Sequence, residues 1–222
     1  MDNWIKLIVD GINWGWTDIL SKLWPPLLAV ILTQRFIEMR KPKLEICPEG
    51  AQPNTWNIFS DGKLSASLPY RMWRIQVEHT KIHGLLAWLI RSRETALRCK
   101  GDLTFFSFDG VELFKMQGRW ASTPEISYLS PIFQSQTIMY PEAVDILYND
   151  NQMLDCIVQF DNDQEAYGWN NESYPTLGKN PRCKLPIGEY RVVVRVSGQN
   201  FPQIRKQFSL VVSEDWERTS LE

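Results

Sequence analysis

The sequence predicts a mainly β protein in which one N-terminal membrane helix precedes an antiparallel β-sandwich. One observation is a mostly apolar run with three tryptophans over residues 12–32, followed by a basic flank. A second is a series of about seven or eight short stretches of strand-like character, separated by turn signals. The third is composition, because 44% hydrophobic residues and a net charge of −2 are typical of an ordinary globular domain.

The membrane helix is predicted to span about residues 12–33. A helix that crosses a bilayer needs about 20 mostly apolar residues, and the run reaches that length only if Asp18 and Lys22 are included. These two residues lie four apart, so on a helix they face each other and can form an ion pair. Pairing lowers the cost of placing both charges within the bilayer.

Aromatic and proline residues complete the predicted anchor. The residues assigned to it are Trp14, Trp16, Asp18, Lys22, Trp24, Pro25 and Pro26. The tryptophans suit a membrane interface, and Pro25 removes a helix hydrogen bond, which predicts a kink near Ser21. Two alternatives stay open: an amphipathic helix over residues 4–23 that lies in the membrane plane, and a helix packed in a protein core.

The charges that flank the helix predict its orientation. The C-terminal flank carries the cations Arg35, Arg40, Lys41 and Lys43. The N-terminal flank carries Lys6 and two aspartates. Because Lys and Arg concentrate on the cytoplasmic side of membrane helices, we expect a single-pass protein of the cell membrane with the bulk of the chain in the cytoplasm. No small-residue cleavage site follows the run, so we expect the anchor to be retained.

The first predicted strands follow the helix directly. Residues 44–50 are expected to form a short strand, and the turn-rich stretch 51–69 a loop or a hairpin with Asp61-Gly62 at its tip. Residues 70–82 alternate between two faces with a period of two, which predicts a half-buried strand. Residues 83–93 fit a helical turn and a strand equally well.

The second half of the chain carries the clearest strand pattern. The strands predicted there are 96–110 paired with 111–120, then 143–150 and 153–163, and finally 187–198 paired with 201–212. In the first strand of the last pair, Tyr190 and the even-numbered valines point one way, and Arg191, Val193 and Arg195 point the other.

These elements divide the chain into four predicted parts. They are the membrane-anchor helix (1–41), a linker with the first strand or hairpin (42–70), the β-sandwich domain (71–213) and a C-terminal tail (214–222). About 180 residues after the anchor suffice for one sandwich with a proper core.

A tyrosine corner is predicted at Tyr190, whose ring packs at the end of the sheet while its hydroxyl bonds to the backbone upstream. With this motif, the pattern from Ala96 to Val212 resembles an immunoglobulin-like sandwich. The segments MQGRWASTPE, EAYGWNNESYP and LPIGEYRVVVRV also resemble uncharacterised prokaryotic proteins that combine an N-terminal membrane helix with such a domain. The resemblance covers most of the chain and implies this fold, but it implies no activity and no functional residues.

No group of residues forms a recognisable active site. The only two histidines are His79 and His83; on one strand their Cα atoms would be about 13 Å apart, too far to share a metal ion. No phosphate-binding glycine motif is present, and no nucleophile can be paired with a base. We therefore predict that the protein is not an enzyme and uses no cofactor and no metal.

The four cysteines and an acidic loop have ordinary interpretations. Because the cysteines are far apart in sequence and form no metal-binding or redox motif, they are predicted to be free, mostly buried thiols. The acidic residues Asp161, Asp163, Glu165 and Glu172 fall at positions 1, 3, 5 and 12 of a calcium-loop register. Ala166 replaces the glycine that such a loop needs, so a solvated loop is the favoured interpretation.

One segment is rich in aromatic and amide side chains, a mixture that suits recognition when it lies in a loop. The candidate interaction residues are Tyr167, Trp169, Asn170, Asn171 and Tyr174. The favoured alternative is that Trp169 and Tyr174 cap the end of the core, because large aromatic residues are usually buried.

Together these features predict a non-enzymatic interaction or scaffold module at the cytoplasmic face of the membrane. Its expected partners are the lipid bilayer, an unidentified protein and, through the N-terminal helix, a second copy of the chain. A net charge of −2 argues against nucleic acid. The alternative is a ligand-sensing effector whose membrane helices oligomerise and perturb the bilayer, because the Asp18–Lys22 pair and two prolines suit passive anchoring poorly.

Overall fold

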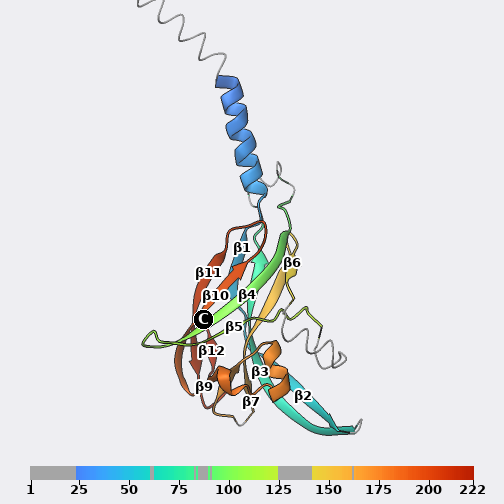
Figure 1. The fold of residues 1–222 in the computed structure, drawn as a ribbon, viewed down its shortest axis with the longest axis vertical. Helices are drawn as coiled ribbons and strands as arrows, with labels where there is room; N and C mark the ends of the chain where they lie inside the picture. Colours follow the sequence, from blue (N-terminus) through green and yellow to red (C-terminus); the bar gives the residue numbers. More distant parts are fainter. Residues whose placement is uncertain are drawn as a thin grey trace, which may run out of the picture.

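Two antiparallel sheets are the main structural elements of the described residues. The computed structural model describes residues 24–60, 63–82, 84, 90, 92–124, 142–161 and 163–222. Figure 1 shows the strands of the two sheets, with the helix of residues 24–40 projecting from one end. The prediction of a mainly β fold is confirmed, whereas most of the ambiguous stretch 83–93 lies outside the described residues.

The first sheet is built around its longest strand. In spatial order it contains β1 (Leu44–Pro48), β3 (Lys63–His79), β7 (Asn151–Phe160), β8 (Ala166–Gly168) and β9 (Lys184–Leu185), with β2 (Gln52–Ser60) also paired to β3. With 17 residues, β3 is long enough to pair with β2 along its first part and with β1 along its last part. A loop or a hairpin was predicted for residues 51–69, and the pairing of β2 with β3 shows the hairpin, although residues 61–62 lie outside the described part.

The second sheet contains the strands with the clearest sequence pattern. In spatial order it contains β12 (Ser220–Leu221), β11 (Ile204–Val212), β10 (Gly188–Ser197), β4 (Ala96–Ser107) and β5 (Glu112–Gln117), with β6 (Val144–Ile146) also paired to β4. The predicted pairs β4–β5 and β10–β11 are both confirmed. Because β6 pairs with β4, the consecutive strands β6 and β7 belong to different sheets.

The sheets extend beyond the predicted sandwich limits of residues 71 and 213. Strands β1 and β2 lie in residues 42–70, where a first strand or hairpin was predicted, and both belong to the first sheet. At the other end of the chain, β12 pairs with β11, so residues 214–222 contribute to the second sheet. We refer to residues 44–222 as the β domain.

Both sheets contribute alternate side chains to one shared core. The core residues include Trp73, Ile75 and Val77 of β3 and Val192, Val194 and Val196 of β10. This is the period-two alternation predicted from the sequence. Burying a side chain of this size contributes about 1.5–3 kcal/mol, and the same alternation turns the intervening polar residues to the outer faces.

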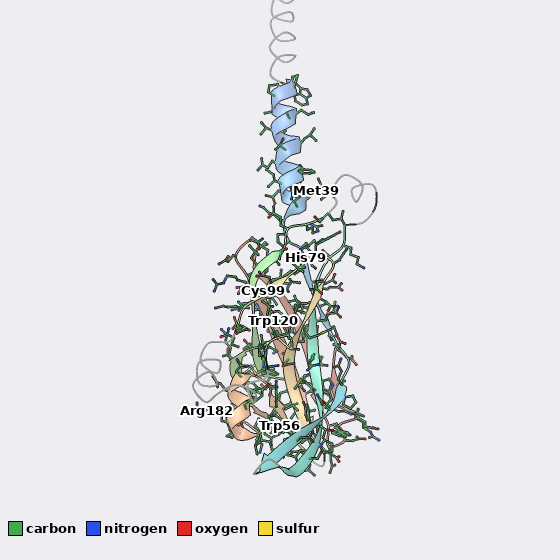
Figure 2. All side chains as sticks on the ribbon, turned by 90° about the vertical axis from the view of Figure 1, so that its right-hand side faces the viewer. Met39, Trp56, His79, Cys99, Trp120 and Arg182 are labelled. Carbon is green, nitrogen blue, oxygen red and sulfur yellow. The ribbon has the colours of Figure 1, made fainter. Side chains whose placement is uncertain are left out.

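Trp120, which follows β5, connects the two sheets inside the core. Its side chain is 1% exposed, and its Nε1 donates to the backbone oxygen of Cys99 in β4 at 3.1 Å. Its backbone forms a β-bridge with Leu154 of β7. Figure 2 shows Trp120 deep within the β domain, on the side of Cys99 that is away from the helix.

Two smaller predictions about the β domain are confirmed. The Tyr190 hydroxyl donates to the backbone oxygen of Pro186 at 2.7 Å, which is the upstream bond of a tyrosine corner. Cys47, Cys99, Cys156 and Cys183 are all free, and all except the half-buried Cys47 are buried. Burial raises the pKa of the Cys99 thiol to about 12, so this thiol stays protonated and unreactive at neutral pH.

Candidate functional site

The helix of residues 24–40 exposes its apolar side chains. Val30, Leu32 and Trp24 are 62%, 60% and 60% exposed, and Leu27, Leu28, Ile31 and Ile37 are exposed as well. Every residue from 24 to 32 is apolar, so this first part of the helix has no polar stripe, whereas its last turns carry Gln34, Arg35, Glu38 and Arg40. A helix that is apolar all round is stable only in an apolar environment.

Only part of the predicted anchor lies within the described residues. Trp24, Pro25 and Pro26 belong to the described helix. Trp14, Trp16, Asp18 and Lys22 lie outside the described residues, as does the kink predicted near Ser21. In the part of the chain that the structure describes, no helix combines the length and the apolar character needed to cross a membrane. The spanning anchor therefore stays a prediction.

The cations predicted to set the topology lie where the helix meets the β domain. Arg35 and Arg40 are on the last turns of the helix, and Lys41 and Lys43 follow before β1; all are exposed. Lys41 also pairs with Glu38. We call Arg35, Arg40, Lys41 and Lys43 the cationic collar.

Hydrogen bonds hold the end of the helix against the β domain. Arg93 donates from Nη1 to the backbone oxygens of Met39 at 2.8 Å and Lys41 at 3.2 Å. The backbone nitrogen of Glu94 donates to the oxygen of Arg40 at 2.7 Å. The last carbonyls of a helix have no partner within it, so a cationic donor satisfies them and complements the helix dipole. The segment that precedes β4 thereby fixes the helix to the second sheet.

His79, the last residue of β3, connects the first sheet to the same junction. Its side chain is 2% exposed, and its Nε2 lies 3.0 Å from the backbone oxygen of Glu94. Because that oxygen can only accept, Nε2 carries the proton in the neutral ring. The ring also meets Tyr148 edge-on, with centroids 5.5 Å apart. Figure 2 shows His79 at the end of the β domain nearest Met39.

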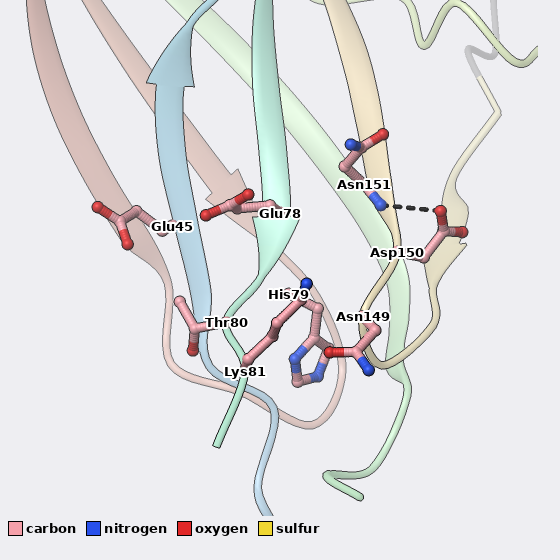
Figure 3. Close-up of a pocket in the computed structure, with 8 residues that line it drawn as sticks. All are labelled: Glu45, Glu78, His79, Thr80, Lys81, Asn149, Asp150 and Asn151. Carbon is pink, nitrogen blue, oxygen red and sulfur yellow. Dashed lines mark hydrogen bonds between the residues drawn. The ribbon is translucent and has the colours of Figure 1, made fainter. Parts of the chain in front are cut away.

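A polar hollow of about 360 Å³ opens beside His79. Figure 3 shows its lining: Glu45, Glu78, His79, Thr80, Lys81, Asn149, Asp150 and Asn151. Glu45 and Glu78 lie opposite each other on β1 and β3, and Asp150 accepts from the backbone nitrogen of Asn151. Within the described residues, no three His, Cys, Asp or Glu side chains are grouped so that they could hold a metal ion. Chemically the hollow offers carboxylate, amide and hydroxyl groups for hydrogen bonding.

Stability is expected to fall as the pH drops below about 6.5, because of His79. Burial lowers the pKa of His79, and Arg93 lowers it too, against the opposing effect of the Glu94 and Thr80 backbone. The unfolded chain, with an ordinary histidine pKa of about 6.5, therefore takes up this proton at a higher pH than the folded chain. The His79 contribution is fully present above about pH 6.5 and is lost as the pH falls toward the folded-state pKa.

Urea unfolding of wild type and His79→Gln at about pH 7.5 and about pH 5.5 measures this effect. The variant is expected to be less stable at the higher pH, because the contacts of the ring are lost, and to lose less stability between the two pH values. Equal losses in the two proteins would show that another group causes the pH dependence.

The predicted interaction segment packs against the outer face of the first sheet. Tyr167, Trp169, Asn170 and Asn171 are buried, and Tyr174 is half-buried. Trp169 contacts Trp56 edge-on at a centroid distance of 5.1 Å and stacks on Tyr70 at 6.2 Å. The aromatic residues therefore form a second apolar cluster, and recognition by this segment stays a prediction.

The amide residues of that segment shape a short 3₁₀ helix, η2 (Asn171–Thr176). The Asn170 side chain accepts from the backbone nitrogen of Glu172 at 3.0 Å, and Ser173 Oγ accepts from the backbone nitrogen of Asn170 at 3.1 Å. The Asn170 side chain also accepts from the backbone nitrogen of Ser173, and this reciprocal Asn170–Ser173 pair is a capping box, which satisfies backbone groups at the start of the helix. A second 3₁₀ helix, η3 (Pro181–Cys183), precedes β9.

Asp155 of β7 is a charged residue that the sequence analysis missed. It has 0% exposure and accepts from Arg119 at 2.9 Å and from Arg74 at 2.8 Å. Burial raises the pKa of the Asp155 carboxyl, while the two guanidinium groups oppose that rise. Arg119 also donates to the oxygen of Thr123 at 2.9 Å. The sequence signal that could have revealed this buried ion pair is Asp155 itself, the single charged residue within the mostly apolar strand β7.

Two of the four acidic residues that match the calcium-loop register form ion pairs with lysines. Asp163 lies 2.7 Å from the ammonium group of Lys179, and Glu165 pairs with Lys184. The hydrogen bond from Lys184 lowers the pKa of Glu165. These pairs support the interpretation of the segment as an ordinary loop.

Comparisons with known proteins were negative. No family model matches the chain, and neither the curated proteins nor the solved structures contain a significant match. What the protein does is therefore inferred from the helix, the junction and the surfaces of the β domain.

Proposed function

We propose that this protein is a membrane-anchored interaction module without catalytic activity, with its β domain at the cytoplasmic face of the cell membrane. The observation that carries the proposal is the first part of the helix, residues 24–32, where every side chain is apolar and exposed. Lipid is the environment that best satisfies such a helix. The cationic collar lies at the C-terminal end of the helix. A flank rich in Lys and Arg is usually on the cytoplasmic side of a membrane helix.

The junction supports a scaffold role for the β domain. Arg93 and Glu94 hold the last turn of the helix, and His79 connects the same segment to the first sheet. A partner bound to the β domain would thus keep a defined orientation relative to the helix.

We further infer that the β domain is an immunoglobulin-like sandwich. Two antiparallel sheets share one core, and Tyr190 forms the hydrogen bond of a tyrosine corner. Such sandwiches display exposed strands and loops for recognition on many unrelated proteins, so the fold is compatible with an interaction module but does not specify the partner.

Charged substitutions in the helix are expected to release the protein from membranes. The double variant Leu28→Asp/Ile31→Asp places two carboxylates in the cytoplasmic half of the predicted span 12–33, where each costs somewhat less than the roughly 2.5–3.5 kcal/mol of the bilayer centre. Carbonate extraction is the measurement: wild type is expected in the pellet and the variant in the supernatant. The control Val111→Asp/Leu113→Asp adds the same charges at exposed apolar positions of the β domain and should stay in the pellet. Wild-type protein in the supernatant would contradict the anchor.

Reporter fusions after Glu222 test the orientation separately. A reporter that works only in the cytoplasm is expected to be active, and one that works only outside the cell is expected to be inactive. The opposite result would place the β domain outside and overturn the charge argument, while leaving the anchor intact.

A further inference from the structure

Three arginines gather on the outer face of the second sheet, the face opposite the core. Arg191 and Arg195 are outward-facing residues of β10, and Arg205 lies directly opposite Arg195 on β11. Arg205 is exposed and the other two are half-buried. We call Arg191, Arg195 and Arg205 the arginine face. Figure 1 shows β11, β10, β4 and β5 side by side in this sheet.

The arginine face lacks the ion pairs that several other arginines form. Arg71, Arg74, Arg119 and Arg218 each form an ion pair with a carboxylate. No ion pair or hydrogen bond is found for the side chains of the arginine face among the described residues, and the Nε atoms of Arg191 and Arg195 are buried without a partner. The carboxylate of Asp102 is nearest by register, opposite Arg195 on β4, but it forms no ion pair with it.

This arrangement is unfavourable for the isolated protein. Like charges directly opposite each other on neighbouring strands destabilise a sheet, and buried polar atoms are normally hydrogen-bonded. Adjacent guanidinium groups do, however, suit an anion, because each can form two parallel hydrogen bonds to one carboxylate. Lys115, exposed on β5, adds another positive charge to the same sheet face.

We propose that the arginine face docks an extended acidic segment of a partner protein. This inference rests on the proposed function and specifies the chemistry of the partner. Neighbouring strands lie about 4.8 Å apart, and residues 191 and 195 are about 13 Å apart along β10. A partner strand with a carboxylate at every second residue repeats at about 6.6 Å, so it can reach both ends of the arginine face with side chains on one side.

Two observations favour an acidic protein over other polyanions. The whole chain carries a net charge of −2; binding of a nucleic acid depends on many cation–phosphate contacts, whereas one short acidic segment needs only the local arginine face. In Figure 1 the strands of the second sheet run roughly along the long axis of the molecule, on which the helix also lies. With the helix anchored in the membrane, the arginine face therefore lies roughly parallel to the helix axis and does not face the bilayer.

Peptide binding to the full chain in nonionic detergent micelles tests the proposal. The probes are a fluorescent peptide of alternating glutamate and threonine, a matched lysine–threonine peptide and a single-stranded thymidine oligonucleotide, each followed by fluorescence anisotropy. The glutamate peptide is expected to bind, and Arg195→Gln/Arg205→Gln to weaken its binding about tenfold or more. The control Arg98→Gln/Arg182→Gln removes the same charge from exposed positions elsewhere and is expected to change binding less than about twofold.

Two further measurements separate lost binding from lost folding. The melting temperature of Arg195→Gln/Arg205→Gln is expected to be no lower than that of wild type, because a repulsive pair is removed. The reversed variant Arg195→Glu/Arg205→Glu is expected to prefer the lysine peptide. Equal weakening in the test and control variants, tighter binding of the oligonucleotide, or no binding of the glutamate peptide would overturn the proposal. Carbonate extraction of the same proteins reports on the anchor independently.

Discussion

Replacing Asp155 by alanine is expected to destabilise the β domain by about 3–5 kcal/mol, because it removes one partner from a buried ion pair. The carboxylate has 0% exposure and Arg119 is 3% exposed, so water cannot replace the lost contact. The guanidinium of Arg119 would keep a hydrogen bond to Thr123 but would lose the carboxylate that it contacts at 2.9 Å. A domain of this kind has a total stability of about 5–15 kcal/mol, so the loss is a large fraction of it.

Urea unfolding followed by tryptophan fluorescence measures this effect. The matched control is Glu217→Ala, which removes the carboxylate of the exposed pair with Arg71 at 3.0 Å and is expected to change stability by about 0–1 kcal/mol. Asp155→Asn tests the charge separately from the shape and is expected to be destabilised as well. Similar small losses for Asp155→Ala and Glu217→Ala would show that the buried pair contributes little.

Replacing Trp120 by alanine is expected to cost about 3–5 kcal/mol, as is typical for truncation of a buried aromatic residue. The side chain is 1% exposed, so the truncation leaves a cavity between the two sheets. The oxygen of Cys99 would also lose the indole donor at 3.1 Å. Trp120→Phe restores most of the ring but not the donor, so its loss is expected to be smaller, at about 1–3 kcal/mol.

The control for Trp120 is an aromatic residue of the surface. Phe108 is 71% exposed at the turn between β4 and β5, and Phe108→Ala is expected to change stability by less than about 0.5 kcal/mol. Urea unfolding of the three variants beside wild type gives the comparison. If Trp120→Ala and Phe108→Ala shifted the midpoint equally, the indole would not join the sheets as described.

The sequence by itself determined the local elements, since side-chain alternation and turn chemistry act over a few neighbouring residues. The alternation around Trp73 and around Val194 predicted which side chains enter the core, and both patterns are found in the structure. The tyrosine corner at Tyr190 was predictable for the same reason, because its acceptor, Pro186, lies four residues upstream.

Only the tertiary structure decided which distant residues meet. The pairing of β6 with β4, the contact of Arg119 with Asp155 and the junction between His79 and Glu94 depend on strand order and register. Arg195 faces Arg205 only because β10 and β11 pair in one register, and a shift of one residue would turn one of the two arginines toward the core. Local pattern specifies which residues point outward, but the register between strands specifies their neighbours.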